Sequence, residues 1–261
     1  MIRRLAEAVF AVAESLRFFT RLPLGASTRA PDFTKIGWAA PLAGAIVGGL
    51  GAAVFLATRK LGLPGIICST LAVAVEIVFT GGLHEDGLAD VADGFGGGRD
   101  RDAKLAIMRD SRIGTYGAIA LCLVLLLRIQ AIAALARPYP EFAAGAFVLA
   151  GATSRAAALT PLTWTLPARA DGIGVSGGTV DGIVLFGVAA TLAVLAAALG
   201  LLSLGLARSF FACAVGAAAA RLSVSLAQSQ IGGQTGDVCG ATAAISQVAV
   251  LLALLVGIRN A

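Results

Sequence analysis

Long apolar stretches, each about the length of a membrane crossing, dominate the hydrophobic pattern of this chain. A transmembrane helix needs about 20 mostly apolar residues. The sequence predicts seven such helices, over residues 37–57, 63–83, 115–136, 141–160, 181–206, 209–228 and 240–258. Small residues within them, such as Gly44 and Gly48, are typical of helices that pack closely in lipid. We therefore expect an all-α, polytopic helical bundle that forms one membrane-embedded domain over residues 1–261.

The residues before the first predicted crossing have a different pattern. From residue 5 to residue 19 the apolar and polar positions fit an amphipathic helix that lies at the membrane interface. Charged residues interrupt the apolar run of this segment, at Glu7, Glu14 and Arg17, so it does not have the pattern of a cleaved signal peptide. We expect residues 1–36 to form an interfacial segment.

The composition agrees with a protein embedded in lipid and excludes a water-soluble domain. Apolar residues make up 58% of the 261 residues and charged residues only 13%, about half of the charged fraction of an average globular protein. The net charge is +5, but no basic run or finger spacing accompanies it, so we expect membrane lipid and no nucleic acid as a partner. The four cysteines have no spacing typical of a disulfide framework or zinc site.

Basic residues are concentrated before the first predicted crossing and after the second. The first group is Arg3, Arg4, Arg17, Arg21, Arg29 and Lys35, and the second is Arg99, Arg101, Lys104, Arg109 and Arg112. The positive-inside rule places both groups in the cytoplasm. With seven crossings, the loops near residues 161–180 and 229–239 fall on the same side.

The segment 84–114 is the candidate catalytic segment, because the chain has no comparable density of charge elsewhere. Asp86, Asp90 and Asp93 are spaced i, i+4 and i+7, so a helix would present all three carboxylates on one face. Such a face is unfavourable unless a cation neutralises it, and oxygen ligands without cysteines favour Mg²⁺. Because Mg²⁺ usually keeps coordination sites for water and phosphate oxygens, the pattern predicts a pyrophosphate site. The alternative is a solvated acidic loop.

Residues that follow Asp86, Asp90 and Asp93 in the sequence are candidates for binding phosphate oxygens. Gly96 and Gly97 lie in a glycine-rich stretch whose backbone N–H groups could approach an anion, or which is simply a flexible turn. Arg109 and Arg112 flank Asp110, and guanidinium groups can clamp phosphate bidentately. Arginines near the end of a crossing also serve as membrane-edge anchors, which is the alternative for this pair.

Two more polar, glycine-rich loops are predicted on the side of the aspartates. They contribute Arg169, Asp171 and Asp237 as candidate substrate-binding residues, with Asp237 the stronger candidate, and either loop could also be only a turn. Intramembrane ionisable groups are costly, so each one is a functional candidate.

Three further ionisable positions need an interpretation. His84 is the sole histidine, and it could bind substrate or form a local hydrogen bond. Arg155, near the cytoplasmic end of its predicted crossing, could reach substrate. For Glu76 and Arg128, a buried structural ion pair is the simpler interpretation.

Several of these segments together resemble one known family. Residues 81–94 (GGLHEDGLADVADG) and 110–117 (DSRIGTYG) strongly resemble the cobalamin synthase family, the adenosylcobinamide-GDP ribazoletransferases. The resemblance extends to residues 18–23 (FFTRLP), 168–172 (ARADG) and 233–241 (GQTGDVCGA), and so covers nearly the whole chain.

The resemblance implies an enzyme of the bacterial inner membrane, with its active site facing the cytoplasm, that acts in the nucleotide-loop assembly of coenzyme B12. Such an enzyme joins adenosylcobinamide-GDP to α-ribazole or its 5′-phosphate and releases GMP. Our hypothesis is that Asp86, Asp90 and Asp93 hold Mg²⁺ on the pyrophosphate, while one carboxylate orients or deprotonates the attacking hydroxyl. The sequence leaves open the preferred acceptor, homo-oligomer formation and association with other corrinoid-pathway enzymes.

Two other functions have some support in the sequence. A phospholipid-type CDP-alcohol phosphotransferase would also use membrane-embedded aspartates and Mg²⁺, but the second part of that family's motif is missing. A secondary transporter would suit glycine-rich crossings with intramembrane charges. Its binding site should lie near the bilayer midplane, whereas these acidic residues are predicted at the end of a crossing.

Overall fold

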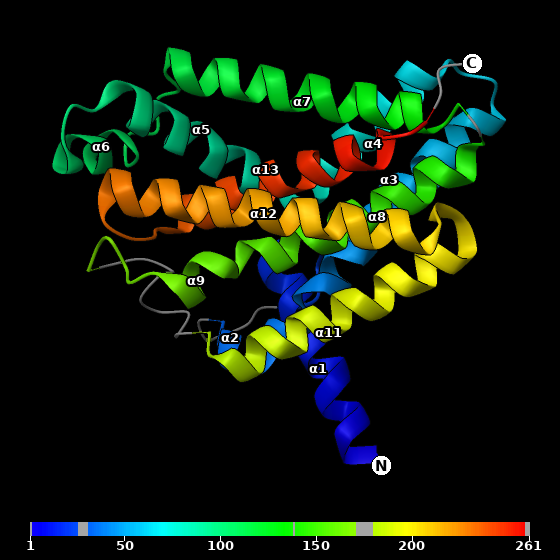
Figure 1. Cartoon of the computed structure of the whole chain (residues 1–261), viewed down its shortest axis with the longest axis horizontal. Coiled ribbons are helices and arrows are strands. Elements are labelled where there is room, and N and C mark those ends of the chain that lie inside the picture. Colours follow the sequence, from blue (N-terminus) through cyan, green and yellow to red (C-terminus); the bar gives the residue numbers. More distant parts are fainter. Residues whose placement is uncertain (1, 26–30, 138, 171–179, 259–261) are drawn as a thin grey trace.

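The computed structural model describes residues 2–25, 31–137, 139–170 and 180–258, and the side chains from residue 5 onward (Figure 1). In these ranges the chain is helical and contains no strand, which confirms the predicted all-α fold. The helices are α1 (Ile2–Phe19), α2 (Phe33–Ile36), the 3₁₀ helix η1 (Gly37–Ala39), α3 (Ala40–Lys60), α4 (Gly65–Thr80), α5 (Leu83–Gly97), α6 (Arg101–Ile107), α7 (Thr115–Leu135), α8 (Pro140–Ala158), α9 (Thr160–Trp164), α11 (Gly182–Leu199), the π-helix η2 (Gly200–Leu204), α12 (Leu206–Ile231) and α13 (Gly236–Leu255).

The helices that could cross a membrane agree with the predicted number. Within the described ranges, six stretches are long and apolar enough by themselves: Phe33–Lys60, Thr115–Leu135, Pro140–Trp164, Gly182–Leu204, Leu206–Ile231 and Gly236–Leu255. A seventh exists if α4 and α5, which meet at 88°, count as one broken crossing. The predicted crossing over residues 63–83 is thus shorter than expected, since α4 has only 16 residues.

The sharp bend between α4 and α5 has a local cause. Gly81 and Gly82 both have positive φ, at 68° and 72°. This left-handed conformation is readily available to glycine, and it ends α4 and starts α5 in a new direction. Two consecutive glycines therefore convert what would be one continuous helix into two, and they direct the acidic segment away from the axis of α4.

Close contact between helix backbones forms the centre of the bundle. A Cβ atom on Gly44 of α3 would overlap the carbonyl oxygen of Gly151 on α8, and one on Gly48 would overlap the carbonyl oxygen of Phe147. Only glycine permits this approach, which is typical of helix packing in lipid. The prediction that Gly44 and Gly48 mediate close packing is confirmed.

The polar segments gather at one end of the bundle. In Figure 1, α5, α6, α9 and the start of α13 lie toward the left, where the long helices α12 and α13 are joined. The side chain of Arg101 donates hydrogen bonds to the carbonyl oxygens of Ile231, at 3.0 Å, and Ala168, at 2.6 Å. Ala168 N–H in turn donates to Gln234 O at 2.8 Å. The described parts of the two later polar loops therefore lie on the side of the acidic segment, as predicted.

Helix α1 has the pattern expected of an interfacial helix. Its N-terminal half extends away from the bundle in Figure 1, and its apolar side chains Leu5, Val9 and Phe10 are 61–66% exposed. Its C-terminal half is held against the bundle, where the Ser15 hydroxyl donates to Ile36 O at 3.1 Å. An exposed apolar face of this kind is suited to the boundary between head groups and acyl chains.

Candidate functional site

The acidic helix α5 packs tightly against the first turns of α13. A Cβ atom on Gly87 would lie 2.7 Å from the carbonyl oxygen of Asp237, and one on Gly240 would lie 3.1 Å from Leu83 O. Glycine on both helices therefore allows the two backbones to approach. This contact brings Asp237, which is distant in sequence, next to the aspartates of α5.

Two aspartates of α5 form an acidic cluster together with Asp237. Asp86 is exposed and Asp90 is half-buried, and Asp90 lies within electrostatic range of both Asp86 and Asp237. The Asp237 carboxylate accepts a hydrogen bond from Arg169 Nη2 at 3.1 Å. In the described part of the chain, no hydrogen bond or ion pair engages the carboxylates of Asp86 and Asp90. The cluster therefore carries more negative than positive charge.

Asp93 does not share the open face of Asp86 and Asp90. It is only 8% exposed, and its two carboxylate oxygens accept hydrogen bonds from Gly114 N–H at 2.7 Å and Gly117 N–H at 2.8 Å. These amides belong to the start of α7, where a helix has unsatisfied donors and favours negative charge. The three aspartates keep the predicted helical spacing, but α7 covers the third, so the structure corrects the expectation that all three carboxylates are presented together.

The glycine-rich stretch is also different from the expected loop. Gly96 and Gly97 belong to the last turn of α5 rather than to a flexible turn. A Cβ atom on Gly96 would lie 2.6 Å from the Tyr116 ring, and one on Gly97 would lie 3.3 Å from Ile107. These glycines therefore let α6 and α7 pack closely on α5. The prediction of a loop at this position is wrong, because both glycines are helical.

A polar cleft of about 510 Å³ opens beside α5. It brings together five of the predicted site residues, namely Asp86, Asp90, Arg109, Asp110 and Arg112. It also contains two charged residues that the sequence analysis did not assign to the site, Arg21 and Glu85. Arg21 had a signal in the sequence, since it lies within the 18–23 motif. The cleft therefore combines carboxylates with guanidinium groups, which are suited to binding phosphate oxygens.

Asp110 and Arg112 form a two-pronged ion pair at the edge of the cleft. Arg112 Nε donates to Asp110 Oδ1 at 3.0 Å, and Arg112 Nη2 donates to Oδ2 at 2.6 Å. These hydrogen bonds lower the pKa of the Asp110 carboxyl to about 2. Asp110 is therefore ionised at neutral pH, and its main contact is the arginine that it orients.

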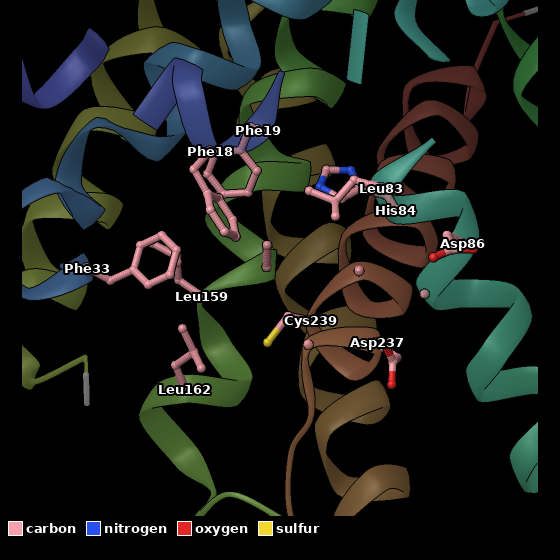
Figure 2. Close-up of a pocket in the computed structure, with 14 residues that line it drawn as sticks. Phe18, Phe19, Phe33, Leu83, His84, Asp86, Leu159, Leu162, Asp237 and Cys239 are labelled. Carbon is pink, nitrogen blue, oxygen red and sulfur yellow. The ribbon is translucent and has the colours of Figure 1, made fainter. Parts of the chain in front are cut away.

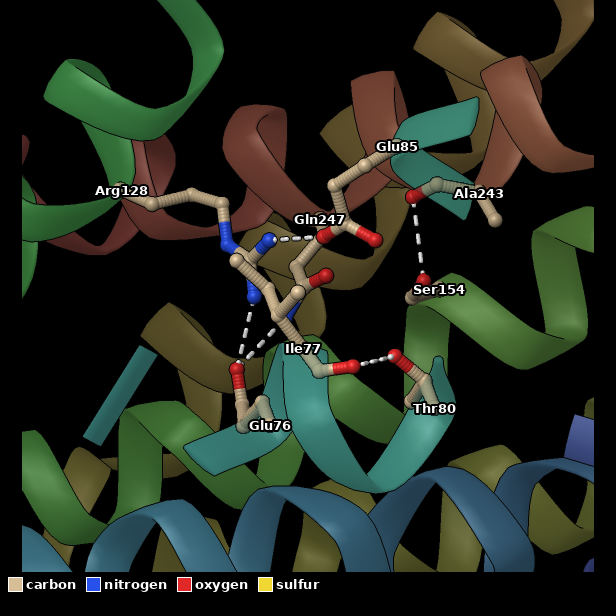
Figure 3. Close-up of polar contacts among 8 residues, drawn as sticks. All are labelled: Glu76, Ile77, Thr80, Glu85, Arg128, Ser154, Ala243 and Gln247. Carbon is tan, nitrogen blue, oxygen red and sulfur yellow. Dashed lines mark hydrogen bonds and ion pairs between the residues drawn. The ribbon is translucent and has the colours of Figure 1, made fainter. Parts of the chain in front are cut away.

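A buried ionic network lies behind the cleft (Figure 3). Arg128 of α7 donates to Glu76 of α4 at 2.8 Å and to Glu85 of α5 at 2.5 Å. Gln247 of α13 adds a longer hydrogen bond of 3.5 Å to Glu76. The interpretation of Glu76 and Arg128 as members of a buried structural ion pair is confirmed, and the structure shows that they pair with each other and that Arg128 also pairs with Glu85, next to Asp86 in sequence. It links the two arms of the α4–α5 bend to α7.

Two of the remaining predicted residues, Arg155 and His84, do not line the cleft. Arg155 is 2% exposed, does not line the cleft, and lies within electrostatic range of Glu76 and Glu85. His84 points into a separate, apolar cavity on the other side of Asp86 (Figure 2). Asp171 lies outside the described residues.

The fold and the cleft define a polytopic helical membrane protein with an acidic, arginine-lined site at one end of its bundle. The family model for cobalamin-5-phosphate synthase matches residues 11–255. The chain belongs to this family, whose members are transferases of cobalamin biosynthesis.

Relatives support the same assignment over almost the whole length. A protein of Azorhizobium caulinodans named adenosylcobinamide-GDP ribazoletransferase is 42% identical over 253 residues, which cover 95% of this chain and 96% of the relative. Proteins with the same name from Xanthobacter autotrophicus and Bradyrhizobium diazoefficiens are 44% and 42% identical, and cover 93% and 90% of this chain and 94% and 89% of their own. No solved structure is significantly similar to this protein.

Proposed function

We propose that this protein is an adenosylcobinamide-GDP ribazoletransferase that uses the polar cleft as its active site. It transfers the adenosylcobinamide-phosphate group of adenosylcobinamide-GDP to α-ribazole or α-ribazole 5′-phosphate and releases GMP. The observation that carries this proposal is the composition of the cleft, in which Asp86 and Asp90, whose carboxylates have no hydrogen-bond or ion-pair partner among the described residues, lie with Arg21, Arg109 and Arg112. Family membership supplies the substrates.

The reaction is a displacement at phosphorus. A ribose hydroxyl oxygen of the acceptor forms a bond to the phosphorus attached to adenosylcobinamide, and the bond from that phosphorus to the bridging oxygen breaks. GMP leaves with the bridging oxygen, and the hydroxyl proton passes to a carboxylate and then to solvent. Positioning and charge stabilisation contribute most to such a step, and fixed guanidinium groups contribute both.

Mg²⁺ fits the acidic side of this cleft. Asp86 and Asp90 would hold it, because neither carboxylate has a partner among the described residues. Asp237 lies within electrostatic range of Asp90 and adds to the negative charge around them. One or two carboxylates together with substrate phosphate oxygens are typical of protein-bound Mg²⁺. When bound, the ion would neutralise charge on the pyrophosphate and the departing GMP.

Each charged residue of the cleft has a distinct task in this scheme. Arg112, oriented by Asp110, and Arg109 bind the oxygens of the diphosphate. Arg21, which lines the same cleft next to Gly81, adds a third guanidinium group for these oxygens. Whichever of Asp86 and Asp90 faces the acceptor orients its hydroxyl. Asp93 acts indirectly, since its hydrogen bonds to α7 fix the helix that carries the other two.

The protein resides in the bacterial inner membrane with the cleft facing the cytoplasm. The distribution of basic residues around the first two predicted crossings supports this orientation. The exposed apolar face of α1 contacts lipid at the same surface. A homo-oligomer, or an assembly with other corrinoid-pathway enzymes, would form within this membrane, and crosslinking in native vesicles followed by mass spectrometry would identify either one.

The deciding experiment is a turnover assay with purified protein reconstituted in lipid vesicles. It supplies adenosylcobinamide-GDP with α-ribazole, or with its 5′-phosphate, in Mg²⁺ or in EDTA, and follows GMP and the corrinoid product by chromatography. We expect GMP and the corrinoid product in equal amounts with Mg²⁺, and neither in EDTA; the product is adenosylcobalamin from α-ribazole and adenosylcobalamin 5′-phosphate from α-ribazole 5′-phosphate. Well-folded protein that produces no GMP with either acceptor would contradict the proposed function.

A further inference from the structure

We infer that the apolar cavity beside Asp86 binds the aromatic base of the nucleoside acceptor. This inference rests on the proposed function and extends it, because it assigns a location to the second substrate. The cavity, of about 120 Å³, lies where the ends of α1 and α8 meet the starts of α5 and α13 (Figure 2). It is separate from the polar cleft, and both are lined by Asp86.

The walls of the cavity suit a flat aromatic ring. Phe18 packs edge-to-face on Phe19 and on Phe33, with ring centroids 4.8 and 5.0 Å apart. Leu159, beside Phe33 in Figure 2, and Leu162 extend this apolar lining. A closed apolar cavity of about 150 Å³ is known to take up benzene. This cavity is of similar size, and it is open on one side, so a fused second ring can extend beyond it.

A buried polar side chain, His84, lies among the apolar residues that line the cavity, in addition to the two carboxylates at its edge. His84 is 4% exposed, and its Nε2 atom has no hydrogen-bond partner among the described residues. Its ring points toward that of Phe19, with centroids 6.0 Å apart (Figure 2). A buried polar atom without a partner is costly, and a ligand that supplies one gains that free energy on binding.

The base of α-ribazole matches the unpartnered Nε2 of His84. It is a dimethylbenzimidazole, with two fused apolar rings and one unsubstituted ring nitrogen that can accept a hydrogen bond from an imidazole N–H. Guanine, the other base in the reaction, has several donors and acceptors. Walls made of phenylalanine and leucine would leave most of those groups unsatisfied, which strongly disfavours guanine here.

The location of the cavity also agrees with the chemistry. Asp86 and Asp237 lie at its edge, and Asp90, within electrostatic range of both, lines the polar cleft. A base held among the phenylalanines therefore directs its ribose toward the carboxylates, where the hydroxyl must meet the phosphate. This placement gives the aromatic residues of the 18–23 motif a function that the phosphate chemistry does not supply.

Filling the cavity tests the inference directly. Ala158 lines it and is 5% exposed, so Ala158→Leu places new methyl groups where the base would lie. We expect the KM for α-ribazole to rise about ten-fold or more, with the KM for adenosylcobinamide-GDP within about two-fold of its original value. The matched control is Ala190→Leu on the exposed surface of α11, which should change neither KM.

A second variant tests the hydrogen bond. The indole riboside analogue of α-ribazole has the same fused rings but lacks the accepting nitrogen. The unmodified protein should prefer α-ribazole to this analogue by about ten-fold in kcat/KM. His84→Phe keeps an aromatic ring and removes the donor, so it should abolish the preference. A preference that survives in His84→Phe would overturn the assigned hydrogen bond.

Equilibrium dialysis with radiolabelled α-ribazole separates this inference from the proposed function. If the protein binds α-ribazole and Ala158→Leu loses the binding, the cavity assignment holds even if no GMP is released. If Ala158→Leu instead raises only the KM for adenosylcobinamide-GDP, the cavity holds part of the donor and the inference is wrong. If the folded variant retains both KM values and α-ribazole binding, the cavity holds neither substrate and the inference is also wrong.

Discussion

The Asp93 carboxylate accepts a hydrogen bond of 2.8 Å from the backbone N–H of Gly117, in the first turn of α7. A Cβ atom on Gly117 would overlap this carboxylate, so the contact depends on glycine at that position. It fixes α5 to α7 and leaves Asp86 and Asp90 as the α5 aspartates that line the cleft. The Asp93 carboxylate, which the sequence analysis assigns to the metal, is thus engaged in the structure by backbone N–H groups at the start of α7.

This relationship predicts that substitutions at Asp93 and Gly117 act mainly by lowering the free energy of unfolding. Asp93→Asn replaces a charged acceptor by a neutral amide, and we expect the free energy of unfolding to fall by about 2 kcal/mol. Gly117→Ala should destabilise the protein similarly because of the overlap. Thermal unfolding in detergent, followed by circular dichroism, measures both. Asp86→Asn is the control, and an equal loss of stability in that variant would contradict the distinction.

The two aspartates of the cleft should show the opposite behaviour. Asp86→Asn and Asp90→Asn remove the proposed metal ligands, and we expect kcat to fall by about 10²- to 10³-fold with the melting temperature retained. The control is Asp102→Asn, in the same polar segment, whose side chain is 88% exposed and does not line the cleft. GMP release at full rate by Asp90→Asn would remove that residue from the mechanism.

Arg112 should contribute to the affinity for the diphosphate substrate, adenosylcobinamide-GDP. Arg112→Lys keeps the positive charge but loses the planar group that contacts both oxygens of Asp110. We expect the KM for adenosylcobinamide-GDP to rise about ten-fold and the KM for α-ribazole to stay near its original value. Steady-state kinetics with each substrate varied in turn distinguish the two, and a change confined to α-ribazole would contradict the assignment.

The pH profile of the reaction should contain no inflection from the titration of Asp110. Its pKa in the folded protein is lowered to about 2 by Arg112, below the ordinary value of about 3.9. The pair is therefore fully formed above the ordinary pKa, and it is lost only as the pH falls toward 2. Profiles of kcat/KM between about pH 5 and pH 9 should have the same inflections in the original protein and in Asp110→Asn. An inflection that disappears in the variant would contradict this.

Breaking the buried network should be more damaging than neutralising it. Arg128→Met leaves Glu76 and Glu85 without their cation, and we expect a loss of about 3–5 kcal/mol in stability. The double variant Glu85→Gln, Arg128→Met removes one charge of each sign, leaves Glu76 within electrostatic range of Arg155, and should recover much of that loss. Unfolding in detergent compares the two, and a double variant no more stable than Arg128→Met would show that charge balance is not the cause.

The apolar stretches and the acidic segment were predictable because both depend on local pattern. In a stretch of about 20 apolar residues that crosses the lipid, the backbone N–H and C=O groups find hydrogen-bond partners by forming a helix. The number of long helices therefore follows from hydropathy. The spacing of Asp86 and Asp90 placed both on one helical face, and the structure places both in the cleft. The glycine-rich turn at 96–97 was predicted wrongly, since composition alone does not distinguish a flexible loop from close helix packing.

The sequence by itself determined the class of fold, the location of the acidic helix and the family. Tertiary structure decided which carboxylates stay open, that Asp237 joins them, that Arg128 pairs with both Glu76 and Glu85, and that Phe18 and His84 share a cavity. The physical reason is that helical periodicity assigns each side chain to a face, but not to the neighbour that covers that face. That neighbour depends on which helix backbones can approach, and hence on glycines far apart in the chain.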